Sequence, residues 1–439
     1  MRKYTFKGGI HPLHSTGAGK NETKKKPIRE FVSDTVCIAM DQHLGAPSIP
    51  CVKKGDKVLV GQVIGEANGP RGIPVHASVS GIVTEVGPKQ MLGKAPSTCV
   101  TINNDFNDNW VELNGLGNVE HCDPELIIPA IRDAGICGMG GACFPTHVKL
   151  SIPEGKTIDT IIVNGAECET YLTADHRLML EEPIRIVDGL RAVMRALNVK
   201  QGIIAIEDNK MDAIEVVSKA AYGRDGVKVA ILRAKYPQGG EKQLIRAVTG
   251  REVPSGKLPM DVHVAVINVS TAAAIADAVI RGKPVVERIV TITGCVREPD
   301  NLRLRIGTVY QDAIGACGGY SDYVGKIISG GTMTGMCAPN DTVATTKGCG
   351  GIVAIEYQQA KSLQETACIR CGKCVQACPM GLDPFRLKNL CDRNDLKGAK
   401  DAHLMDCMLC GSCAYVCPAR RWLVASFRNA KELINIRRI

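Results

Sequence analysis

Two cysteine runs near the C-terminal end constrain this chain more than any other feature of its sequence. In each run two residues separate the first three cysteines, three residues precede the fourth, and a proline follows. The runs are Cys368, Cys371, Cys374, Cys378 and then Cys407, Cys410, Cys413, Cys417. Three thiolates in a tight loop cap three irons of a cubane, and the fourth begins a segment that points away and reaches the other cluster. We therefore predict two [4Fe–4S] clusters, one held by Cys368, Cys371, Cys374 and Cys417 and one by Cys407, Cys410, Cys413 and Cys378.

The alternative interpretation of each run is a zinc site, because Cys-x2-Cys pairs also bind zinc and each run holds four ligands. The third cysteine and the repeated Cys-Pro ending favour clusters, and they match the pattern of bacterial two-cluster ferredoxins. The other twelve of the 20 cysteines show no comparable spacing, so we expect most of them to be buried small hydrophobes. Cys137, Cys143 and Cys168 alone stand beside other candidate site residues.

The composition indicates several folded domains, since the 439 residues are 45% hydrophobic and 23% charged. An aromatic content of only 4% gives little support for nucleic-acid binding by stacking. Residues 1–9 lack an apolar signal core and no run of 18 apolar residues occurs, so we expect neither a signal peptide nor a transmembrane helix. We therefore expect the chain to work in a reducing cytoplasm. Residues 366–439 carry 13 basic and 6 acidic side chains, which suits an acidic partner such as a ferredoxin.

The first 110 residues favour a small β module. Between residues 30 and 105, short alternating runs are separated by glycine and proline, which is typical of strands and turns. They resemble the biotinyl/lipoyl-type barrel-sandwich hybrid. That family modifies a lysine at a hairpin tip, but the corresponding turn, 69–72, has none, so we expect a structural module. The polar, basic stretch 20–26 is interpreted as a solvated loop.

Residues 111–294 predict an α/β domain. Apolar strand patterns alternate with helical ones, which favours a mainly parallel sheet with helices on both faces and ligands at the carboxyl ends of the strands. The expected strands are 160–164, 202–207, 227–233, 262–269 and 288–293, and the expected helices are 125–134, 177–196, 208–221 and 271–281.

Two further units follow in the sequence. Residues 295–350 predict a small mixed α/β unit with a glycine-rich loop at 329–335, and residues 360–439 predict the helical cluster domain. The tail 420–439 mixes apolar and basic residues. It fits either an amphipathic helix at a membrane surface or a helix that packs on its own domain.

The glycine run at 136–149 is the second informative motif. Glycines let backbone N–H groups approach a phosphate or a planar ring. The run does not fit the dinucleotide fingerprint, because it follows an expected helix and its third glycine position is Cys143.

The run resembles instead the flavin-binding subunit of respiratory NADH dehydrogenase, whose motif Gly-x-Gly-Gly-x-x-Phe-Pro-Thr-x-x-Lys it matches. Segments 164–169 and 236–241 resemble further family segments, except that Ala166 and Gly240 replace acidic residues. Segment 266–271 resembles the family's Asn-Asn-Val-Glu-Thr and keeps its second Asn and its Thr, as Asn268 and Thr271. The resemblance implies FMN contacts at Gly138, Gly140, Gly141, Lys149, Asn164, Glu167, Tyr236, Gly239, Asn268 and Thr271. It implies NAD(H) contacts at Phe144, Glu169 and Glu241.

The order of the four units, over nearly the whole chain, resembles the C subunits of Rnf-type, ion-translocating ferredoxin:NAD+ oxidoreductases. The resemblance implies a peripheral subunit on the cytoplasmic face of the membrane that passes electrons between NAD(H), FMN and two clusters. It also implies an iron–sulfur subunit and integral membrane subunits as partners that couple electron flow to Na+ or H+ movement, with ferredoxin engaged indirectly.

Two other functions remain open from the sequence. The chain fits a soluble electron-transfer subunit that delivers NADH electrons to an amino-acid reductase. It also fits a non-catalytic iron–sulfur scaffold whose flavin site has decayed, as the Ala166 and Gly240 departures suggest. A nucleic-acid-binding protein is disfavoured, because the sequence offers no clustered basic and aromatic face.

Overall fold

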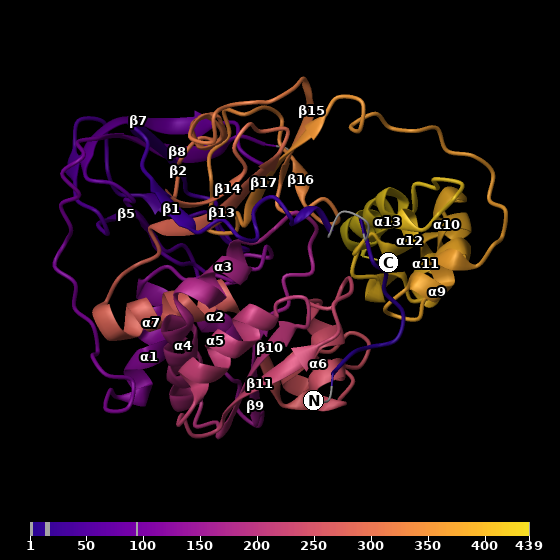
Figure 1. Ribbon diagram of the computed structural model, residues 1–439, viewed down its shortest axis with the longest axis horizontal. Coiled ribbons are helices and arrows are strands. Elements are labelled where there is room, and N and C mark those ends of the chain that lie inside the picture. The colour runs from indigo at the N-terminus through magenta and orange to yellow at the C-terminus, as the bar shows by residue number, and fades with distance from the viewer. Residues whose placement is uncertain (1–2, 14–17, 94, 439) are drawn as a thin grey trace.

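The computed structural model describes residues 3–13, 18–93 and 95–438. Residues 1–2, 14–17, 94 and 439, which fall within the predicted first and last units, lie outside the described residues. The chain forms a large body and a smaller helical domain beside it, which a long irregular connection joins (Figure 1). The mixed α/β multidomain class expected from the sequence is confirmed.

The N-terminal unit is the expected barrel-sandwich of two small antiparallel sheets, in the orders β2-β8-β7-β4 and β3-β5-β6. Its strands are β2 (Thr35–Ala39), β3 (Ile49–Pro50), β4 (Lys57–Val58), β5 (Val63–Glu66), β6 (Val75–His76), β7 (Gly81–Lys89) and β8 (Ser97–Asn104). Strands β7 and β8 approach so closely at Gly81 that a Cβ there would lie 1.9 Å from the Asn103 carbonyl oxygen. Only glycine allows this pairing.

The next unit is built on a four-stranded parallel sheet in the order β11-β10-β9-β12. Its strands are β9 (Thr160–Gly165), β10 (Gln201–Glu207), β11 (Val227–Leu232) and β12 (Val264–Asn268). Its helices are α1 (Pro124–Asp133), α2 (Thr146–Leu150), α3 (Ala174–Glu181), α4 (Pro183–Ala196), α5 (Met211–Ala221), α6 (Glu241–Thr249) and α7 (Val269–Arg281), and a short 3-10 helix spans Pro259–Val262. We call this unit the flavin-type domain.

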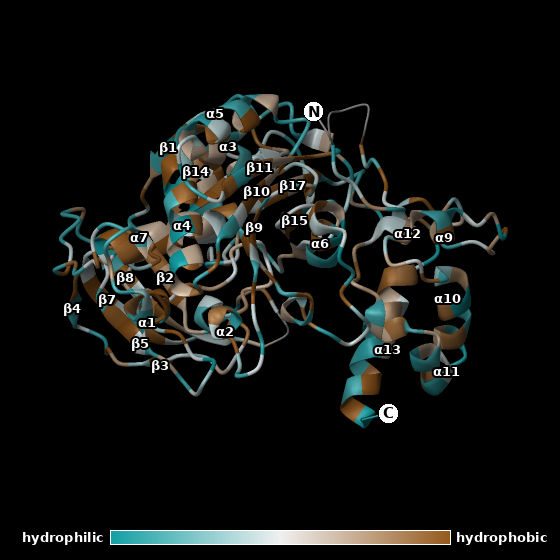
Figure 2. Cartoon of the chain, turned by 90° about the horizontal axis from the view of Figure 1, so that it is seen from below, coloured by the Kyte–Doolittle hydropathy of each residue, from teal (hydrophilic) through white to brown (hydrophobic). Residues whose placement is uncertain are grey.

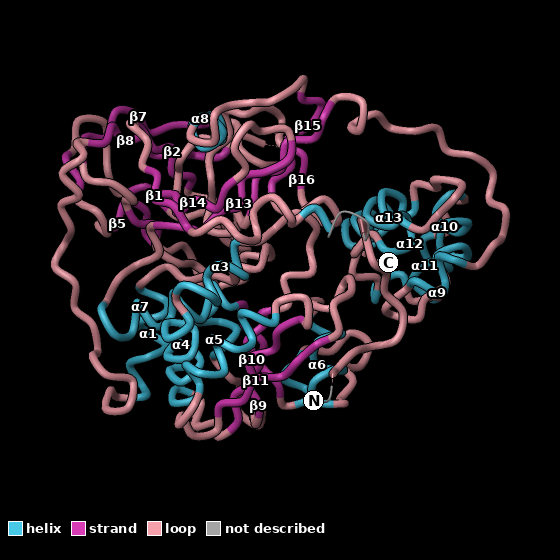
Figure 3. Tube along the Cα trace, in the orientation of Figure 1, coloured by secondary structure: helices cyan, strands magenta, loops and turns pink. Residues whose placement is uncertain are grey.

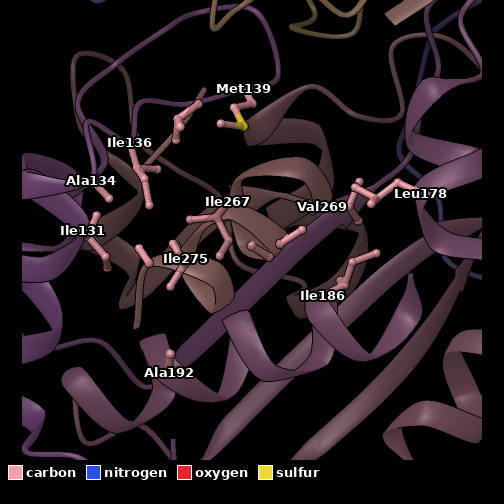
Figure 4. Close-up of a cluster of buried hydrophobic side chains, with 14 of the residues drawn as sticks. Ile131, Ala134, Ile136, Met139, Leu178, Ile186, Ala192, Ile267, Val269 and Ile275 are labelled. Atoms are coloured by element: carbon pink, nitrogen blue, oxygen red, sulfur yellow. The ribbon is translucent and has the colours of Figure 1, made fainter. Parts of the chain in front are cut away.

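Helices cover both faces of this sheet, as the alternating pattern predicted. Side chains of α1, α3, α4, α5 and α7 pack on one face, and α6 packs on the other. Figure 4 shows Met139, Ile267 and Val269 among the buried side chains of the first face, so the glycine run is anchored in this core through Met139.

The expected helix 177–196 is two helices, because α3 ends at Glu181 and α4 begins at Pro183. Proline has no N–H to donate and disfavours helical geometry in the residue before it, so the chain turns at Glu182.

The third unit is a six-stranded mixed sheet in the order β1-β14-β13-β17-β15-β16, with α8 (Tyr310–Gly315) packed in its core. The strands are β1 (Ile28–Phe31), β13 (Glu287–Gly294), β14 (Asp300–Arg305), β15 (Val324–Ser329), β16 (Met336–Cys337) and β17 (Gly351–Glu356). We expected residues 288–293 in the parallel sheet, and this expectation is wrong. The local pattern identified a strand, but this strand pairs antiparallel with β14, which follows it directly in the chain, and parallel with the distant β17.

The helical cluster domain follows residues 357–372, which form neither helix nor strand (Figure 3). Its helices are α9 (Lys373–Ala377), α10 (Pro384–Asp392), α11 (Leu396–Asp401), α12 (Ser412–Tyr415) and α13 (Leu423–Arg437), with a 3-10 helix at Leu404–Asp406. Along α13, apolar and polar residues alternate (Figure 2), and Leu423, Phe427, Ala430 and Ile434 are buried in the domain's own core. The tail therefore packs on its own domain. None of the described helices is both long and apolar enough to cross a membrane.

Candidate flavin and iron–sulfur sites

The eight run cysteines gather around two cavities, and the grouping is the one predicted from their spacing. Cys378, Cys407, Cys410 and Cys413 line one, which we call the inner cavity. Cys368, Cys371, Cys374 and Cys417 line the other, which we call the outer cavity. The fourth cysteine of each run crosses to the other run's cavity, because α9 and α12 carry it away from its own loop.

The donor chemistry of both cavities fits a cubane. Four thiols line each of them, and the rest of the inner wall is largely apolar. Among the described residues no three His, Cys, Asp or Glu side chains converge on a single metal-ion position. A cubane does not require that convergence, because each of its irons takes one thiolate.

The two cavities differ in exposure. Cys410 and Cys413 of the inner cavity are each 8% exposed, whereas Cys368 and Cys371 of the outer cavity are exposed. The inner cavity also faces the flavin-type domain, where the Tyr236 hydroxyl donates to the Cys410 carbonyl oxygen at 2.7 Å.

Several predicted flavin contacts meet at the carboxyl edge of the parallel sheet. Asn164 is the next-to-last residue of β9 and Asn268 is the last residue of β12, and the two are register partners. The glycine run lies beside them, because a Cβ on Gly140 would lie 3.4 Å from the Asn268 Cβ. The Met139 N–H donates to the Thr271 hydroxyl at 2.9 Å, which fixes the run against the first turn of α7.

Open space remains above the glycine run. A Cβ on Gly141, whose φ is +110°, would meet no atom within 4 Å. The Asn164 and Asn268 side chains and the N-terminus of α7 lie at the same edge of the sheet as the run. Backbone N–H groups, amides and a helix N-terminus suit a phosphate-bearing ring system. The residues present therefore fit FMN.

Lys149 and Glu241, predicted for FMN and NAD(H), form an ion pair. The Lys149 ammonium donates to Glu241 Oε1 at 2.6 Å and to the Val266 carbonyl oxygen at 2.8 Å. Both side chains are partly exposed, at 33% and 40%, so a ligand can reach them. Phe144, the predicted ring contact, is half-buried on the same run.

Glu167 lies beneath the site in a buried network that the sequence did not reveal. Its carboxylate accepts the Asp175 N–H at 2.8 Å, and Asp175 in turn accepts from the Asn268 amide at 2.7 Å. Lys20 donates to the Glu167 carbonyl oxygen at 2.5 Å. Burial raises the pKa of Glu167 and lowers the pKa of Lys20.

The expectation that residues 20–26 form a solvated loop is therefore wrong for Lys20 and Thr23, which are 7% and 0% exposed. Asp175, the residue that links Glu167 to Asn268, stands in the first turn of α3. An acidic residue there is common for helix stability alone, so the sequence offered no specific signal.

Glu169 points toward the six-stranded sheet. Its carboxylate accepts the Met333 N–H at 3.2 Å and the Thr334 hydroxyl, both from the glycine-rich loop 329–335. Burial raises its pKa. The structure thus brings Glu169 to this loop, whereas Glu241 is paired with Lys149.

Tyr236 and Gly239 lie where the site meets the cluster domain. The Gly239 carbonyl oxygen accepts from the Asn164 amide at 2.9 Å, on the flavin side. The Tyr236 ring is 2% exposed and packs with Ile10, Ala377 and Cys410, on the cluster side. Burial raises the pKa of its phenol.

The two departures from the flavin-subunit pattern have structural surroundings that explain them. Ala166 packs in the apolar core between the sheet and α6, where a carboxylate would be buried. A Cβ on Gly240 would lie 2.8 Å from the Met408 Cε of the cluster domain. The same Cβ would lie 2.6 Å from Gln243 Oε1, so a side chain at 240 would require both the Gln243 and the Met408 side chains to shift.

Comparison with protein-family models divides the chain in the same order. Residues 4–107 match the RnfC barrel sandwich hybrid domain, and residues 131–277 match the Nuo51 FMN-binding domain. Residues 289–336 match the SLBB domain, and residues 367–420 match the 4Fe-4S dicluster domain.

Three curated proteins are similar to this chain over almost its full length. The C subunit of the Na(+)-translocating ferredoxin:NAD(+) oxidoreductase complex of Acetobacterium woodii is 46% identical over 99% of this chain and 98% of its own. The proton-translocating counterpart of Clostridium ljungdahlii is 45% identical over 97% and 93%. The C subunit of the ion-translocating oxidoreductase complex of Rhodobacter capsulatus is 41% identical over 98% and 83%.

Among solved structures, a chain of an NAD+-reducing [NiFe]-hydrogenase in the H2-reduced state aligns with a TM-score of 0.50 and 19% identity. The alignment covers 73% of this chain and 63% of the hydrogenase chain. At this identity the likeness concerns the fold alone.

Proposed function

Because the chain belongs to the C subunits of ion-translocating ferredoxin:NAD+ oxidoreductase complexes, we propose that it passes electrons between NAD(H), FMN and two [4Fe–4S] clusters. The observation that carries the proposal is the placement of a four-cysteine cavity against a flavin-type domain within one chain. An FMN-binding domain and an iron–sulfur domain are both present. The reaction of this single subunit and the number of its clusters belong to the proposal.

The proposed setting follows from the family. The chain would work on the cytoplasmic face of a membrane with an iron–sulfur subunit and integral membrane subunits, and would meet ferredoxin electrons through them. Ion movement would belong to those partners. One relative is named for Na+ and another for protons, so the coupling ion of this chain is not part of the proposal.

The site residues divide the work of holding the cofactor. When bound, FMN supplies the conversion between two-electron hydride transfer and one-electron transfer. Gly140 and Gly141 would offer backbone N–H groups, and the Asn164 and Asn268 amides would hydrogen-bond the flavin. Gly138, whose own N–H donates to the Phe144 carbonyl oxygen at 2.8 Å, would hold the turn of the run in shape.

Lys149, freed from Glu241, would approach the ribityl-phosphate side. Glu241 would then be available to a ribose or carboxamide of NAD(H), and Phe144 would stack on its ring. Glu169 would contribute only if loop 329–335 released it. Glu167 supports this group from below through Asp175, and Thr271 holds the glycine run in place.

The two cavities suggest an order of electron transfer. The inner cavity lies against the flavin-type domain, so its cluster would exchange electrons with the flavin. The outer cavity has exposed cysteines, so its cluster would be the one that a partner protein approaches. The basic surface of this domain would suit an acidic partner.

An anaerobic NADH titration of the reconstituted protein tests the proposal. We expect the flavin absorbance to bleach at about one equivalent of NADH, and EPR signals of reduced clusters to follow. In Lys149→Met, FMN should bind roughly 10 to 100 times more weakly, the loss expected for one charge-assisted hydrogen bond.

The matched control is Lys156→Met, which removes an ion pair to Asp261 outside the site and should leave FMN binding unchanged. Clusters that dithionite reduces, in a protein that binds no FMN, would contradict the proposal and favour the non-catalytic scaffold. Co-purification with a soluble reductase in place of membrane subunits would favour the amino-acid reductase setting.

A further inference from the structure

The N-terminal segment runs along the join between the flavin-type and cluster domains before it enters β1. We call residues 3–13 the strap. Figure 1 shows this indigo trace leaving the flavin-type domain, passing the yellow cluster helices and returning to the large body. Its first contact extends the parallel sheet beyond β11. The Tyr4 N–H donates to the Ile231 carbonyl oxygen at 2.8 Å, and the Arg233 N–H donates to the Tyr4 carbonyl oxygen at 2.9 Å.

The middle of the strap is fixed to the flavin-type domain. Ile10 and Tyr236 exchange two backbone hydrogen bonds of 2.8 Å each. The Lys235 ammonium donates to the Gly8 carbonyl oxygen at 2.9 Å and to that of Phe6, and it lies 3.9 Å from the centre of the Phe6 ring. A cation over a ring face adds to the attraction of these carbonyls.

Gly8 and Gly9 of the strap also contact the cluster domain. The Gly9 N–H donates to the Ala377 carbonyl oxygen at 3.1 Å. A Cβ on Gly8 would lie 2.7 Å from the carbonyl oxygen of Cys378, a cysteine of the inner cavity, and Gly8 has a φ of +81°. Both the conformation and the close approach exclude a side chain there.

The other contacts between the two domains come from side chains. The Tyr236 and Ser255 hydroxyls donate to the cluster domain at 2.7 and 2.6 Å, and the Gln243 amide reaches the Pro379 carbonyl oxygen at 3.4 Å and the Met380 sulfur at 3.0 Å. The cluster domain has its own core, and the buried apolar contact between the domains is the small group formed by Ile10, Tyr236, Ala377 and Cys410. The covalent connection, residues 357–372, has no regular structure. Electron tunnelling rates fall steeply with distance, so a backbone clamp at the inner cavity has a direct functional consequence.

We propose that the strap is an interdomain clamp that sets the distance between the flavin site and the inner cluster, with Gly8 as a positioning residue. The proposal rests on the proposed function. It concerns the one-electron step from the reduced flavin to the inner cluster, in which the flavin loses one electron, the cluster gains it, and any proton released passes to solvent. The preceding hydride transfer from NADH lies outside the clamp.

The test uses the full-length, reconstituted protein with Gly8→Ala. After mixing with NADH in a stopped-flow instrument, flavin bleaching should keep its wild-type rate, while cluster reduction should slow roughly tenfold, within the range that an ångström-scale misplacement produces. Hydrogen exchange of the strap peptide should rise, because the Gly9 amide would lose its partner. The matched control is Gly117→Ala, with a φ of +80° and no atom within 4 Å.

Wild-type cluster reduction in a Gly8→Ala protein that retains both clusters would overturn the clamp. If this variant fails to retain its clusters, Lys235→Met decides the matter, since it releases the Phe6 and Gly8 carbonyls without adding an atom beside Cys378. Slowed cluster reduction and faster strap exchange in Lys235→Met support the clamp, and unchanged values overturn it. Absence of flavin bleaching in the wild type would contradict the proposed function instead, so the two failures are distinguishable.

Discussion

The flavin-type domain meets the barrel-sandwich and the cluster domain in physically different ways. Toward the barrel-sandwich there is no boundary in the core, because one continuous cluster of buried side chains runs from Val36 and Ile38 of β2 to Ile161 and Val163 of β9. The join also buries Lys347, whose ammonium donates to the Pro74 and Gly135 carbonyl oxygens at 3.1 and 2.7 Å. These two units are expected to unfold together.

Toward the cluster domain the join is small and made largely of backbone. The cluster domain buries its own core around Leu387, Phe427 and Ile434. The strap, the Tyr236 hydroxyl, a 2.6 Å hydrogen bond from Ser255 to Asp406 and the contacts of the Gln243 amide with Pro379 and Met380 connect it to the flavin-type domain. The comparison teaches that one join maintains the fold, whereas the other sets the separation of two redox sites and adds little to stability.

The sharpest test of this separation is the loss of the inner cluster. In Cys413→Ala we expect NADH still to bleach the flavin, because the core of the flavin-type domain is separate from that of the cluster domain. Reduction of either cluster by NADH should be lost. Iron analysis measures the loss of the cluster, stopped-flow absorbance measures flavin bleaching, and EPR measures cluster reduction. Cys391→Ala, a cysteine of the same domain outside both cavities, should behave as the wild type. Loss of flavin reactivity in Cys413→Ala would show that the two domains depend on each other.

Core truncations should separate the two joins by stability. Phe427→Ala should lower the unfolding free energy of the cluster domain by about 3–5 kcal/mol, and Ile38→Ala should lower that of the barrel-sandwich and flavin-type domain together by about 2–5 kcal/mol. Anaerobic denaturant unfolding, followed by flavin and cluster absorbance, should show two transitions. Each substitution should move only its own. A single transition shifted by both would contradict the comparison.

Lys347 should give the first join a distinctive pH dependence. Burial lowers its pKa from 10.5 to about 8. Below pH 8 the folded state carries this buried charge at full cost. Between pH 8 and 10.5 the unfolded state binds more protons, so stability rises with pH, and above 10.5 the contribution is constant.

Relative to Lys347→Met, wild-type stability should therefore rise by up to about 3 kcal/mol from pH 8 to 10.5. Urea unfolding at a series of pH values measures this difference, with Trp110 fluorescence as the probe in a Trp422→Phe background, since the chain has two tryptophans. Lys57→Met, on the barrel surface, is the control and should give a flat difference. A flat difference for Lys347 as well would mean that its charge is not buried.

The smallest effect is expected for Tyr236→Phe, which removes the hydrogen bond to Cys410. One such bond contributes about 1 kcal/mol, so docking should weaken slightly while each domain keeps its own stability. Cluster reduction should slow by a few-fold, with flavin bleaching unchanged. Tyr222→Phe, which alters an exposed ring, provides the baseline. If the Tyr236→Phe protein does not retain FMN, Tyr236 contacts the flavin, as the family resemblance implies.

Much of this structure could be predicted because its signals are local. The crossed grouping of the cysteines follows from spacing and short helices, and the glycine run, Asn164 and Asn268 were indicated by the resemblance of short local motifs to a flavin-binding family. Residues joined by distant contacts could not be predicted. The pattern of 288–293 identifies a strand but carries no information about its partners, and nothing near Lys20 indicates that its ammonium is buried beside Glu167.

The sequence by itself determined which thiols group into two cavities, because ligand spacing acts over a few residues, and its resemblance to a flavin-binding family pointed to the segments at the sheet edge. Only the tertiary structure decided how the sites are related. It turned Tyr236 toward Cys410, fitted Gly240 around Met408 and laid Gly8 against Cys378. Such contacts join residues more than 150 positions apart, and their geometry exists only after the separate cores have formed and docked.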